Sequence, residues 1–193
     1  MPKLPPKDYI QAVKFPSTVT LAPIGVVHSP YTERHGTPRQ AQLRDVPPDY
    51  QPAIARIELF RDRIPPIALK DLDGFERIWV IAWLHLNENW NPTVLPPRGP
   101  KVRRGTLATR APHRPNPIGL SAPRLRAIDG LTLYVEGIDL LDQTPVLDIK
   151  PYVTYCDAFP TAKCGYVDDL DAQGTQEVDI FGVHRPPVPT EPT

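Results

Sequence analysis

Prolines occur along the whole chain, and they restrict the secondary structure that it can form. The sequence contains 27 prolines among 193 residues, where about 5% is usual. Proline fixes φ and has no backbone N–H, so it is excluded from helix interiors and from central strands. Because the prolines are spread out and not gathered in one tract, the sequence predicts many short strands joined by stiff turns, and no long helix.

Alternating apolar and polar residues predict where these strands lie. The longest candidate, FERIWVIAWLHL at residues 75–86, is β-branched and aromatic and is expected to be a central strand buried on both faces. Asp129-Gly130 separates two alternating stretches, which is typical of a type I′ hairpin. The only helix expected is a short one within residues 65–75, ended by Gly74. Further strands are expected in residues 23–29, 53–60, 104–110, 123–128 and 144–152.

These elements predict an all-β fold: a small closed antiparallel β-barrel with few short helices and proline-rich extensions. We expect an N-terminal extension over residues 1–20, a barrel domain over residues 21–167 and a polar, proline-rich tail over residues 168–193. No apolar run is long enough to cross a membrane, and the N-terminus has no secretory signal. The two cysteines, Cys156 and Cys164, would stay reduced in the cytoplasm, where the protein is expected to be found.

The net charge is zero, but basic and acidic residues are separated along the chain. A basic segment from Arg98 to Ile128 contains no Asp or Glu, whereas acidic residues follow from Glu136 onwards. Two interpretations are open: the two sets neutralise each other across a sheet, or the basic segment forms a groove for a phosphate backbone. The basic residues of this segment are Arg98, Lys101, Arg103, Arg104, Arg110, Arg114, Arg124 and Arg126.

One stretch of the basic segment, RAPHRPNPIGLS at residues 110–121, combines positive charge with stiffness. Its three prolines fix an extended connector, because each also pushes the preceding residue toward extended geometry. Arg110, Arg114 and Asn116 would therefore present their donors in fixed positions. The same stretch could instead be a rigid barrel corner whose arginines are only solvated, and the residues alone leave both interpretations open.

The chain lacks the common motifs for binding nucleotides and metals. It has no G-x-G-x-x-G and no G-x-x-x-x-G-K, which excludes the Rossmann and P-loop phosphate sites. No G-x-S-x-G occurs, and the five histidines are scattered without an H-E-x-x-H pattern, so no metal site is expected. Composition and spacing alone indicate an all-β protein with a rigid basic loop.

Five strings in the sequence, taken together, are more specific. They are PIGVVHSPY, PRQ at residues 38–40, NPTVLPPR, LATRAPHRPNPIGLS and DLLDQTPVLDIKPY, in this order. The set resembles the TsaA-like family, whose best-known members are the TrmO tRNA methyltransferases. The resemblance implies a small antiparallel barrel, a homodimer, S-adenosylmethionine as cofactor and the anticodon stem-loop of tRNA as partner. The implied reaction is N-methylation of threonylcarbamoyladenosine, the modified base next to the anticodon.

The resemblance also implies which residues bind the cofactor. Arg39 or Arg110 would take its carboxylate bidentately. Asp139 and Asp142 would accept from its hydroxyls or ammonium, and the leucines would enclose its adenine. The complete set of implied cofactor positions is Pro38, Arg39, Gln40, His85, Leu86, Arg110, Leu120, Asp139, Leu140, Leu141 and Asp142.

Candidate substrate contacts lie in the same strings, at Arg114, Asn116 and Lys150. No catalytic residue is assigned, although the acceptor nitrogen must lose a proton and a base within hydrogen-bond reach would help. Two other functions remain open: a barrel that binds S-adenosylmethionine or RNA without catalysis, and a methyltransferase with another substrate.

The sequence departs from the family pattern in two places. Gln143 stands where the family usually has glycine, so it must adopt a backbone conformation that glycine takes more easily. In addition, the residues that follow Tyr152 are too few for the C-terminal domain that well-known bacterial members carry.

Overall fold

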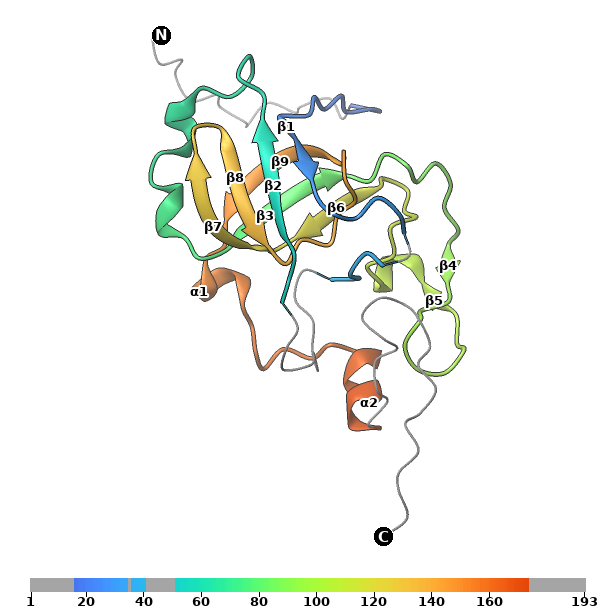
Figure 1. The fold of residues 1–193 in the computed structure, drawn as a ribbon. Coiled ribbons are helices and arrows are strands. Elements are labelled where there is room, and N and C mark those ends of the chain that lie inside the picture. The colour runs from blue at the N-terminus through green and yellow to red at the C-terminus, as the bar shows by residue number, and fades with distance from the viewer. Residues whose placement is uncertain (1–15, 35, 41–50, 174–193) are drawn as a thin grey trace, which may run out of the picture.

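A computed structural model describes residues 16–34, 36–40 and 51–173, and its main element is an antiparallel seven-stranded sheet (Figure 1). The strands lie in the order β6-β3-β9-β1-β2-β8-β7. A separate two-stranded ribbon, β4–β5, extends beside β6. The strands of the large sheet are β1 (Gly25–His28), β2 (Ile54–Leu59), β3 (Ile78–Trp83), β6 (Ile118–Ser121), β7 (Arg124–Asp129), β8 (Thr132–Glu136) and β9 (Pro145–Pro151), and those of the ribbon are β4 (Thr93–Val94) and β5 (Arg104–Gly105).

The all-β expectation is confirmed, but closure into a barrel is not found in the described residues and stays a prediction. The strand order has two ends, β6 and β7, which follow each other in the chain through Pro123. One isolated bridge, between Arg77 and Arg124, joins the start of β7 to the residue before β3. Two backbone hydrogen bonds accompany it, from Ile78 N to Pro123 O at 3.3 Å and from Leu125 N to Glu76 O at 2.8 Å.

The core lies on one face of this sheet, because the strands alternate buried and accessible residues. In β2 every second residue is buried, namely Ala55, Ile57 and Leu59, while Ile54 points to solvent. Ile57 meets Leu133 of β8 in register, and both are 0% exposed. Full burial of such a side chain is worth roughly 1.5–3 kcal/mol, so the period-two pattern is sufficient to fix which face turns inward.

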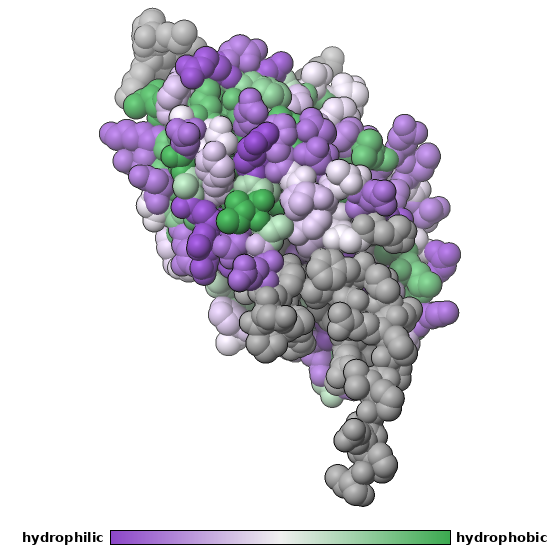
Figure 2. Space-filling model, in the orientation of Figure 1, coloured by the Kyte–Doolittle hydropathy of each residue, from purple (hydrophilic) through white to green (hydrophobic). Residues whose placement is uncertain are grey.

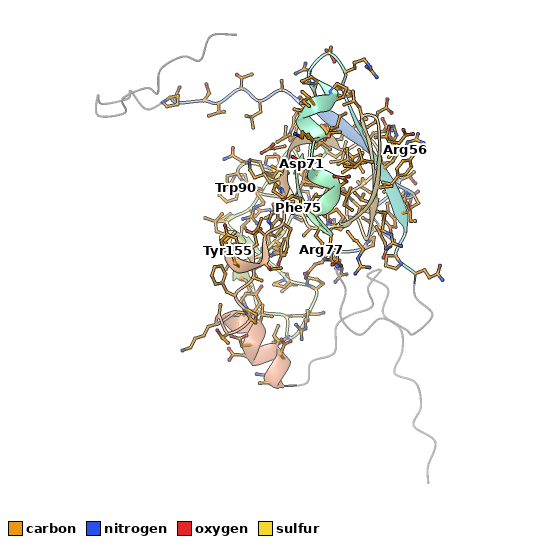
Figure 3. All side chains as sticks on the ribbon, turned by 90° about the vertical axis from the view of Figure 1, so that its left-hand side faces the viewer. Arg56, Asp71, Phe75, Arg77, Trp90 and Tyr155 are labelled. Atoms are coloured by element: carbon orange, nitrogen blue, oxygen red, sulfur yellow. The ribbon has the colours of Figure 1, made fainter. Side chains whose placement is uncertain are left out.

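The expected central strand at residues 75–86 is shorter and less buried than predicted. β3 covers only Ile78–Trp83, and its outward residues Trp79 and Ile81 are half-buried while Trp83 is exposed. The reason is that cover on this outer face, among the described residues, is concentrated at Trp79, whose ring centroid lies 5.3 Å from that of Tyr152 and whose Nε1 donates to Asp157. Figure 3 shows Trp90 and Tyr155 on the side of the molecule opposite Arg56 of β2.

Two further local predictions are corrected. The strand expected over residues 104–110 is limited to the two residues of β5, because the chain then enters the 3-10 turn η3 (Thr106–Ala108), where Thr106 is buried. Residues 65–75 form no α-helix but two 3-10 turns, η1 (Pro66–Leu69) and η2 (Leu72–Gly74), and the second does end at Gly74.

The β7–β8 hairpin is present, but its turn is shifted by one residue. Asp129 pairs with Thr132, so the turn residues are Gly130 and Leu131, and only Gly130 (φ 57°) has a positive φ. A single positive φ at the first turn position matches type II′ and not the expected type I′. Burial explains the shift, since Leu131 is buried in the core and its carbonyl accepts from Leu59 N at 2.9 Å.

After β9, the chain leaves the sheet through α1 (Thr154–Asp157) and ends its described part with α2 (Tyr166–Ala172). Asp157 Oδ2 accepts from Val153 N at 2.8 Å and from Trp79 Nε1 at 2.9 Å, which ties α1 to β3. These two hydrogen bonds hold the pKa of Asp157 below its ordinary value.

Helix α2 packs against the loop between β4 and β5. Leu170 is the buried residue of this helix, and it fills the space beside Gly99. The Arg98 guanidinium pairs with Asp171, and the Arg104 guanidinium lies 4.4 Å from the ring centroid of Tyr166. The expected boundary between residues 167 and 168 therefore falls inside a docked helix. Residues 1–15 and 174–193 of the expected extensions lie outside the described part of the chain.

The surface carries no large apolar belt on the face shown in Figure 2, where hydrophilic residues predominate and hydrophobic ones are scattered. Within the described ranges, no helix has the length and apolar character needed to cross a membrane.

Candidate functional site

The antiparallel ladders bring most of the motif segments to one end of the sheet. Pairing of Val26 with Pro145 places the end of β1 beside the start of β9. Ala82 pairs with Val146 and Trp83 with Ile118, so β3 ends, and β6 begins, at the same place. The segments attached there are residues 29–40, 84–87, 110–117 and 138–144, and four of the five sequence strings contribute to them.

Residues 139–144 dock on the chain that leaves β1. Backbone hydrogen bonds run from Gln143 N to Val27 O at 2.8 Å and from Asp142 N to Tyr31 O at 2.7 Å. Ser29 adds a side-chain link, because its Oγ donates to Leu140 O at 2.8 Å. This packing fixes the backbone of the segment that carries Asp139 to Asp142.

A polar cluster surrounds Asp142. Ser29 N donates to its Oδ1 at 3.1 Å, and Gln143 Nε2 donates to its Oδ2 at 3.1 Å. Burial raises the pKa of Asp142. The two hydrogen bonds, a further one from Gln143 N and the charge of the nearby His28 ring lower it by more, so the pKa lies below its ordinary value. His28 in turn lies between Asp142 and Glu58, with its Nε2 3.3 Å from Glu58 Oε2. Asp142 is therefore an ionised carboxylate with a fixed orientation.

Apolar side chains gather between the end of β3, β6 and residues 139–142. A Cβ on Gly119 would lie 3.0 Å from Leu84 Cδ2 and 3.6 Å from Leu140 Cδ2, so these three residues are in close contact. Leu140 is buried there, which makes it a packing residue, whereas Leu141 is half-buried. The neighbouring Leu120 is exposed and offers an apolar surface at this end of the sheet.

The stiff loop is anchored to the segment before β4. Thr106 N donates to Pro92 O at 3.0 Å, the Thr106 hydroxyl donates to Asn91 O, and a ring nitrogen of His113 lies 3.0 Å from Asn89 O. Arg110 lies between these anchors and is exposed, and its guanidinium makes no hydrogen bond or ion pair within the described part of the chain.

The remaining candidate residues are not brought together by any contact among the described residues. Pro38 is buried, while Arg39 and Gln40 are exposed on the chain that follows Tyr31. His85 is half-buried, with its ring centroid 6.0 Å from that of Trp83. Leu86 and Asn116 are exposed, and Asn116 uses its backbone carbonyl to accept from Ile118 N at 2.7 Å.

Lys150 lies away from the other candidates. It pairs with Trp79 in the β3–β9 ladder, toward the opposite end of the sheet. Its Nζ is 2.6 Å from Asp148 Oδ2 on the same face of β9.

The basic segment is partly neutralised. Arg126 pairs with Glu136 at 3.2 Å, which is an ion pair between the basic segment and the later acidic residues, as one interpretation predicted. Arg124 pairs at 2.6 Å with Glu76, which lies outside that acidic set. Arg98 is engaged by Asp171 of α2. The exposed cations of the segment that make no ion pair with another described residue are Lys101, Arg103 and Arg110.

Sequence reasoning missed three polar residues of this site. Ser29 and His28 belong to the first string, and Glu58 lies on the neighbouring strand, but none was singled out. The available signal was the polar pair His-Ser directly after the apolar Val26 and Val27, at the end of an expected strand.

Comparison with known proteins identifies the family. The model of the tRNA-methyltransferase O N-terminal domain matches residues 26–158. The chain belongs to the TrmO family. A tRNA (adenine(37)-N6)-methyltransferase of Escherichia coli is 36% identical over 156 residues, which cover 77% of this chain and 64% of that protein.

Two other similar proteins extend the comparison. A probable S-adenosyl-L-methionine-binding protein of Methanothermobacter thermautotrophicus is 39% identical over 134 residues, or 69% of this chain and 90% of that protein. The crystal structure of TrmO from Pseudomonas aeruginosa superposes with a TM-score of 0.62 at 38% identity, covering 78% of this chain and 63% of that one. The chain thus spans less than two thirds of the E. coli and P. aeruginosa proteins.

Proposed function

We propose that the chain binds S-adenosylmethionine at the end of the sheet formed by β1, β3, β6 and β9, and that it transfers the methyl group to N6 of an adenosine in tRNA. The observation that carries the proposal is the convergence of four motif segments, distant in sequence, at this end. The E. coli relative is named for this reaction at position 37. Threonylcarbamoyladenosine is the acceptor that we propose, and the cytoplasm the compartment.

The chemistry of the residues present fits the cofactor. S-adenosylmethionine offers an adenine, ribose hydroxyls, an ammonium, a carboxylate and a sulfonium cation. Asp142 supplies an ionised acceptor with a fixed orientation, and Arg110 supplies an exposed guanidinium suited to a carboxylate. Leu120 and Leu86 supply exposed apolar surface for the adenine. Because Gly119 has no side chain, β6 packs closely against Leu84 and Leu140, and this packing fixes the backbone that carries Leu120.

When bound, S-adenosylmethionine would supply an electrophilic methyl group: the bond from N6 to this methyl would form as the S–CH3 bond breaks, leaving a neutral thioether, and the N6 proton would pass to water. The residues of the chain would position the cofactor and the acceptor nitrogen relative to each other. Holding both partners in line can supply part of the roughly 7–11 kcal/mol that proximity provides in favourable cases. Asp142 would hold a hydroxyl or ammonium of the cofactor and Arg110 its carboxylate, and the exposed cations Lys101 and Arg103 would attract the phosphate backbone.

A direct test uses purified protein, labelled S-adenosylmethionine and two RNA substrates. One is tRNA that carries threonylcarbamoyladenosine, from a strain that lacks this gene, and the other is an unmodified transcript of the same sequence. We expect label in one digested nucleoside of the modified tRNA alone, and loss of label with Asp142→Asn. Label in the transcript would identify another acceptor, and no label in either RNA, with cofactor bound, would contradict the transferase activity.

The second candidate function is cofactor binding without methyl transfer. The observation that favours it is the M. thermautotrophicus relative, of which this chain covers 90% and which is named only for S-adenosyl-L-methionine binding. The same experiment separates the two functions, since a binder gives heat on titration with the cofactor but no labelled nucleoside.

A homodimer is part of the proposal. The outer face of β3 and β6 presents Trp83, Ile118 and Leu120, which are 45%, 45% and 50% exposed and are neighbours in the ladder. Trp90 and Tyr155 are also exposed and lie on one side of the molecule, away from β2 (Figure 3). Aromatic residues are enriched at interface cores. Because Leu120 belongs both to this face and to the cofactor site, a second copy would complete the pocket. Light scattering at micromolar concentration should give twice the 21.6 kDa chain mass.

A further inference from the structure

We propose that Arg114 is a positioning residue for Arg110: its guanidinium holds the two backbone carbonyls on either side of Arg110 and so fixes where that side chain points. The inference rests on the proposed function, because that function assigns Arg110 to the binding of the cofactor. It differs from the expectation that Arg114 itself contacts the substrate.

The first observation is the direction of the Arg114 side chain. Its Nη1 donates to Thr109 O at 2.7 Å and lies 3.3 Å from Ala111 O and from Thr106 O. Thr109 and Ala111 are the immediate neighbours of Arg110. The guanidinium is therefore turned toward the backbone of its own loop, and Arg114 is half-buried while Arg110 is exposed.

The second observation is that these carbonyls lie where the backbone has few other partners. The turn η3 ends at Ala108, and carbonyls at the end of a turn need a donor from outside it. Thr109 partly closes the turn, because its N and Oγ1 donate to Thr106 O at 3.1 Å and 2.9 Å. Ala111 N then donates to Thr109 Oγ1 at 3.3 Å. The carbonyls of Thr109 and Ala111 receive their donor from Arg114.

The third observation is the stiffness of the chain that joins the two arginines. Pro112 lies within this connector and Pro115 directly follows Arg114, and each fixes its own φ. A ring nitrogen of His113 lies 3.0 Å from Asn89 O. A stiff connector returns Arg114 to the same loop that carries Arg110, so little ordering entropy is lost when the guanidinium binds the carbonyls. Charge-assisted hydrogen bonds are also stronger than neutral ones.

A double-mutant cycle tests the inference. Arg110→Met, Arg114→Met and the double variant are titrated with S-adenosylmethionine by calorimetry. We expect each single variant to bind about tenfold more weakly, the effect of losing one charge-assisted hydrogen bond, and the double variant to bind no more weakly than Arg110→Met alone. Losses that multiply in the double variant would show that the two arginines act independently. Arg63→Met is the control, since it removes an exposed arginine that follows the end of β2, where Leu59 pairs with Gly25 at the end of β1 opposite to the candidate site, and it should leave cofactor affinity unchanged.

Hydrogen exchange of the amides at residues 106–111 gives a readout that needs no ligand. Exchange should accelerate in Arg114→Met, stay at the wild-type rate in Arg110→Met and be intermediate in Arg114→Lys, because one ammonium reaches the carbonyls without the planar fork. Unchanged exchange in Arg114→Met would overturn the positioning role. A wild-type protein that gives no heat with the cofactor would instead contradict the proposed function, and the exchange result would still stand.

Salt dependence separates positioning from direct contact with RNA. If Arg114 neutralised a phosphate, Arg114→Met would lower the slope of log affinity for tRNA against log salt by about one, and the positioning role would be refuted. We expect the slope to stay unchanged. Should Arg114→Met fail to fold, Thr109→Val provides a second variant, because it removes the hydroxyl links to Thr106 O and Ala111 N without removing charge. It should also weaken cofactor binding and accelerate exchange in the loop.

Discussion

The side-chain amide of Gln143 donates to the carboxylate of its neighbour Asp142 at 3.1 Å. The same nitrogen lies 3.2 Å from His28 Nδ1, so one amide connects the docked segment to the end of β1. Gln143 achieves this with a φ of 62°, in the left-handed region. The left-handed conformation that the sequence predicts at Gln143 is thus present, and its side chain gives additional support to the carboxylate.

Substitution of Gln143 should separate backbone strain from the side-chain contact. Gln143→Ala keeps the strain and loses the amide, whereas Gln143→Gly loses both. We expect the glycine variant to have the higher free energy of unfolding of the two, by about 1 kcal/mol. Both variants should bind S-adenosylmethionine more weakly than wild type. Urea denaturation and calorimetry measure the two effects, and an alanine variant as stable as the glycine variant would argue against strain at this position.

The pKa of Asp142 predicts how stability depends on pH. Because the folded-state pKa lies below the unfolded one, the ionised carboxylate stabilises the fold at pH values above the unfolded pKa of about 4. This contribution is lost as pH falls through the lower folded pKa. Thermal unfolding of wild type and Asp142→Asn should therefore differ at pH 6 and converge in strong acid. A difference that persists unchanged to pH 2 would point to packing instead of charge.

Two isoleucines on one strand provide a matched test of the core. Ile57 is 0% exposed and Ile54 is 61% exposed, three residues earlier in β2. Ile57→Ala should reduce the free energy of unfolding by about 2–5 kcal/mol. Ile54→Ala should change it by no more than about 0.5 kcal/mol. Similar losses at both positions would mean that the outer face of β2 is covered in solution.

Docking of α2 should depend on the space beside Gly99. A Cβ there would lie 2.5 Å from Leu170 Cδ2, and Gly99 has a φ of 78°, so Gly99→Ala is disfavoured by both contact and conformation. We expect this variant, like Leu170→Ala, to expose the segment after α1 to limited proteolysis while the sheet stays folded. Gly105→Ala is the control, since nothing lies within 4 Å of its added Cβ. Equal cleavage of all three variants and wild type would contradict the docking.

The strands and the candidate site differ in how far the sequence predicts them. β2 and β8 follow their period-two pattern, because one face is buried and the other is not. The turn at Gly130 was displaced by one residue because Leu131 is drawn into the core, which is a tertiary effect. β3 is shorter than its β-branched and aromatic composition predicts, because an aromatic residue in a strand need not be buried, and Trp83 is exposed.

Within the site, local conformation was easier to predict than side-chain partners. The left-handed conformation of Gln143 follows from a single position. The hydrogen-bond partners of Arg114 cannot be predicted in this way, because they depend on how η3 turns the chain back toward Arg114. The same pattern of prolines and arginines would also fit an Arg114 side chain that faces outward. The ion pairs of Arg124 and Arg126 likewise needed the observed strand order.

The hydrogen bond from Ser29 N to Asp142 joins residues 113 positions apart. A chain emerging from the ribosome therefore cannot assemble this candidate site until residues 139–144 have been synthesised and have docked on the chain that leaves β1. Contacts of such sequence separation form late and slowly. Incomplete chains, including any truncated before residue 145, would be unable to retain the ligand, so ligand binding would protect finished molecules alone from degradation.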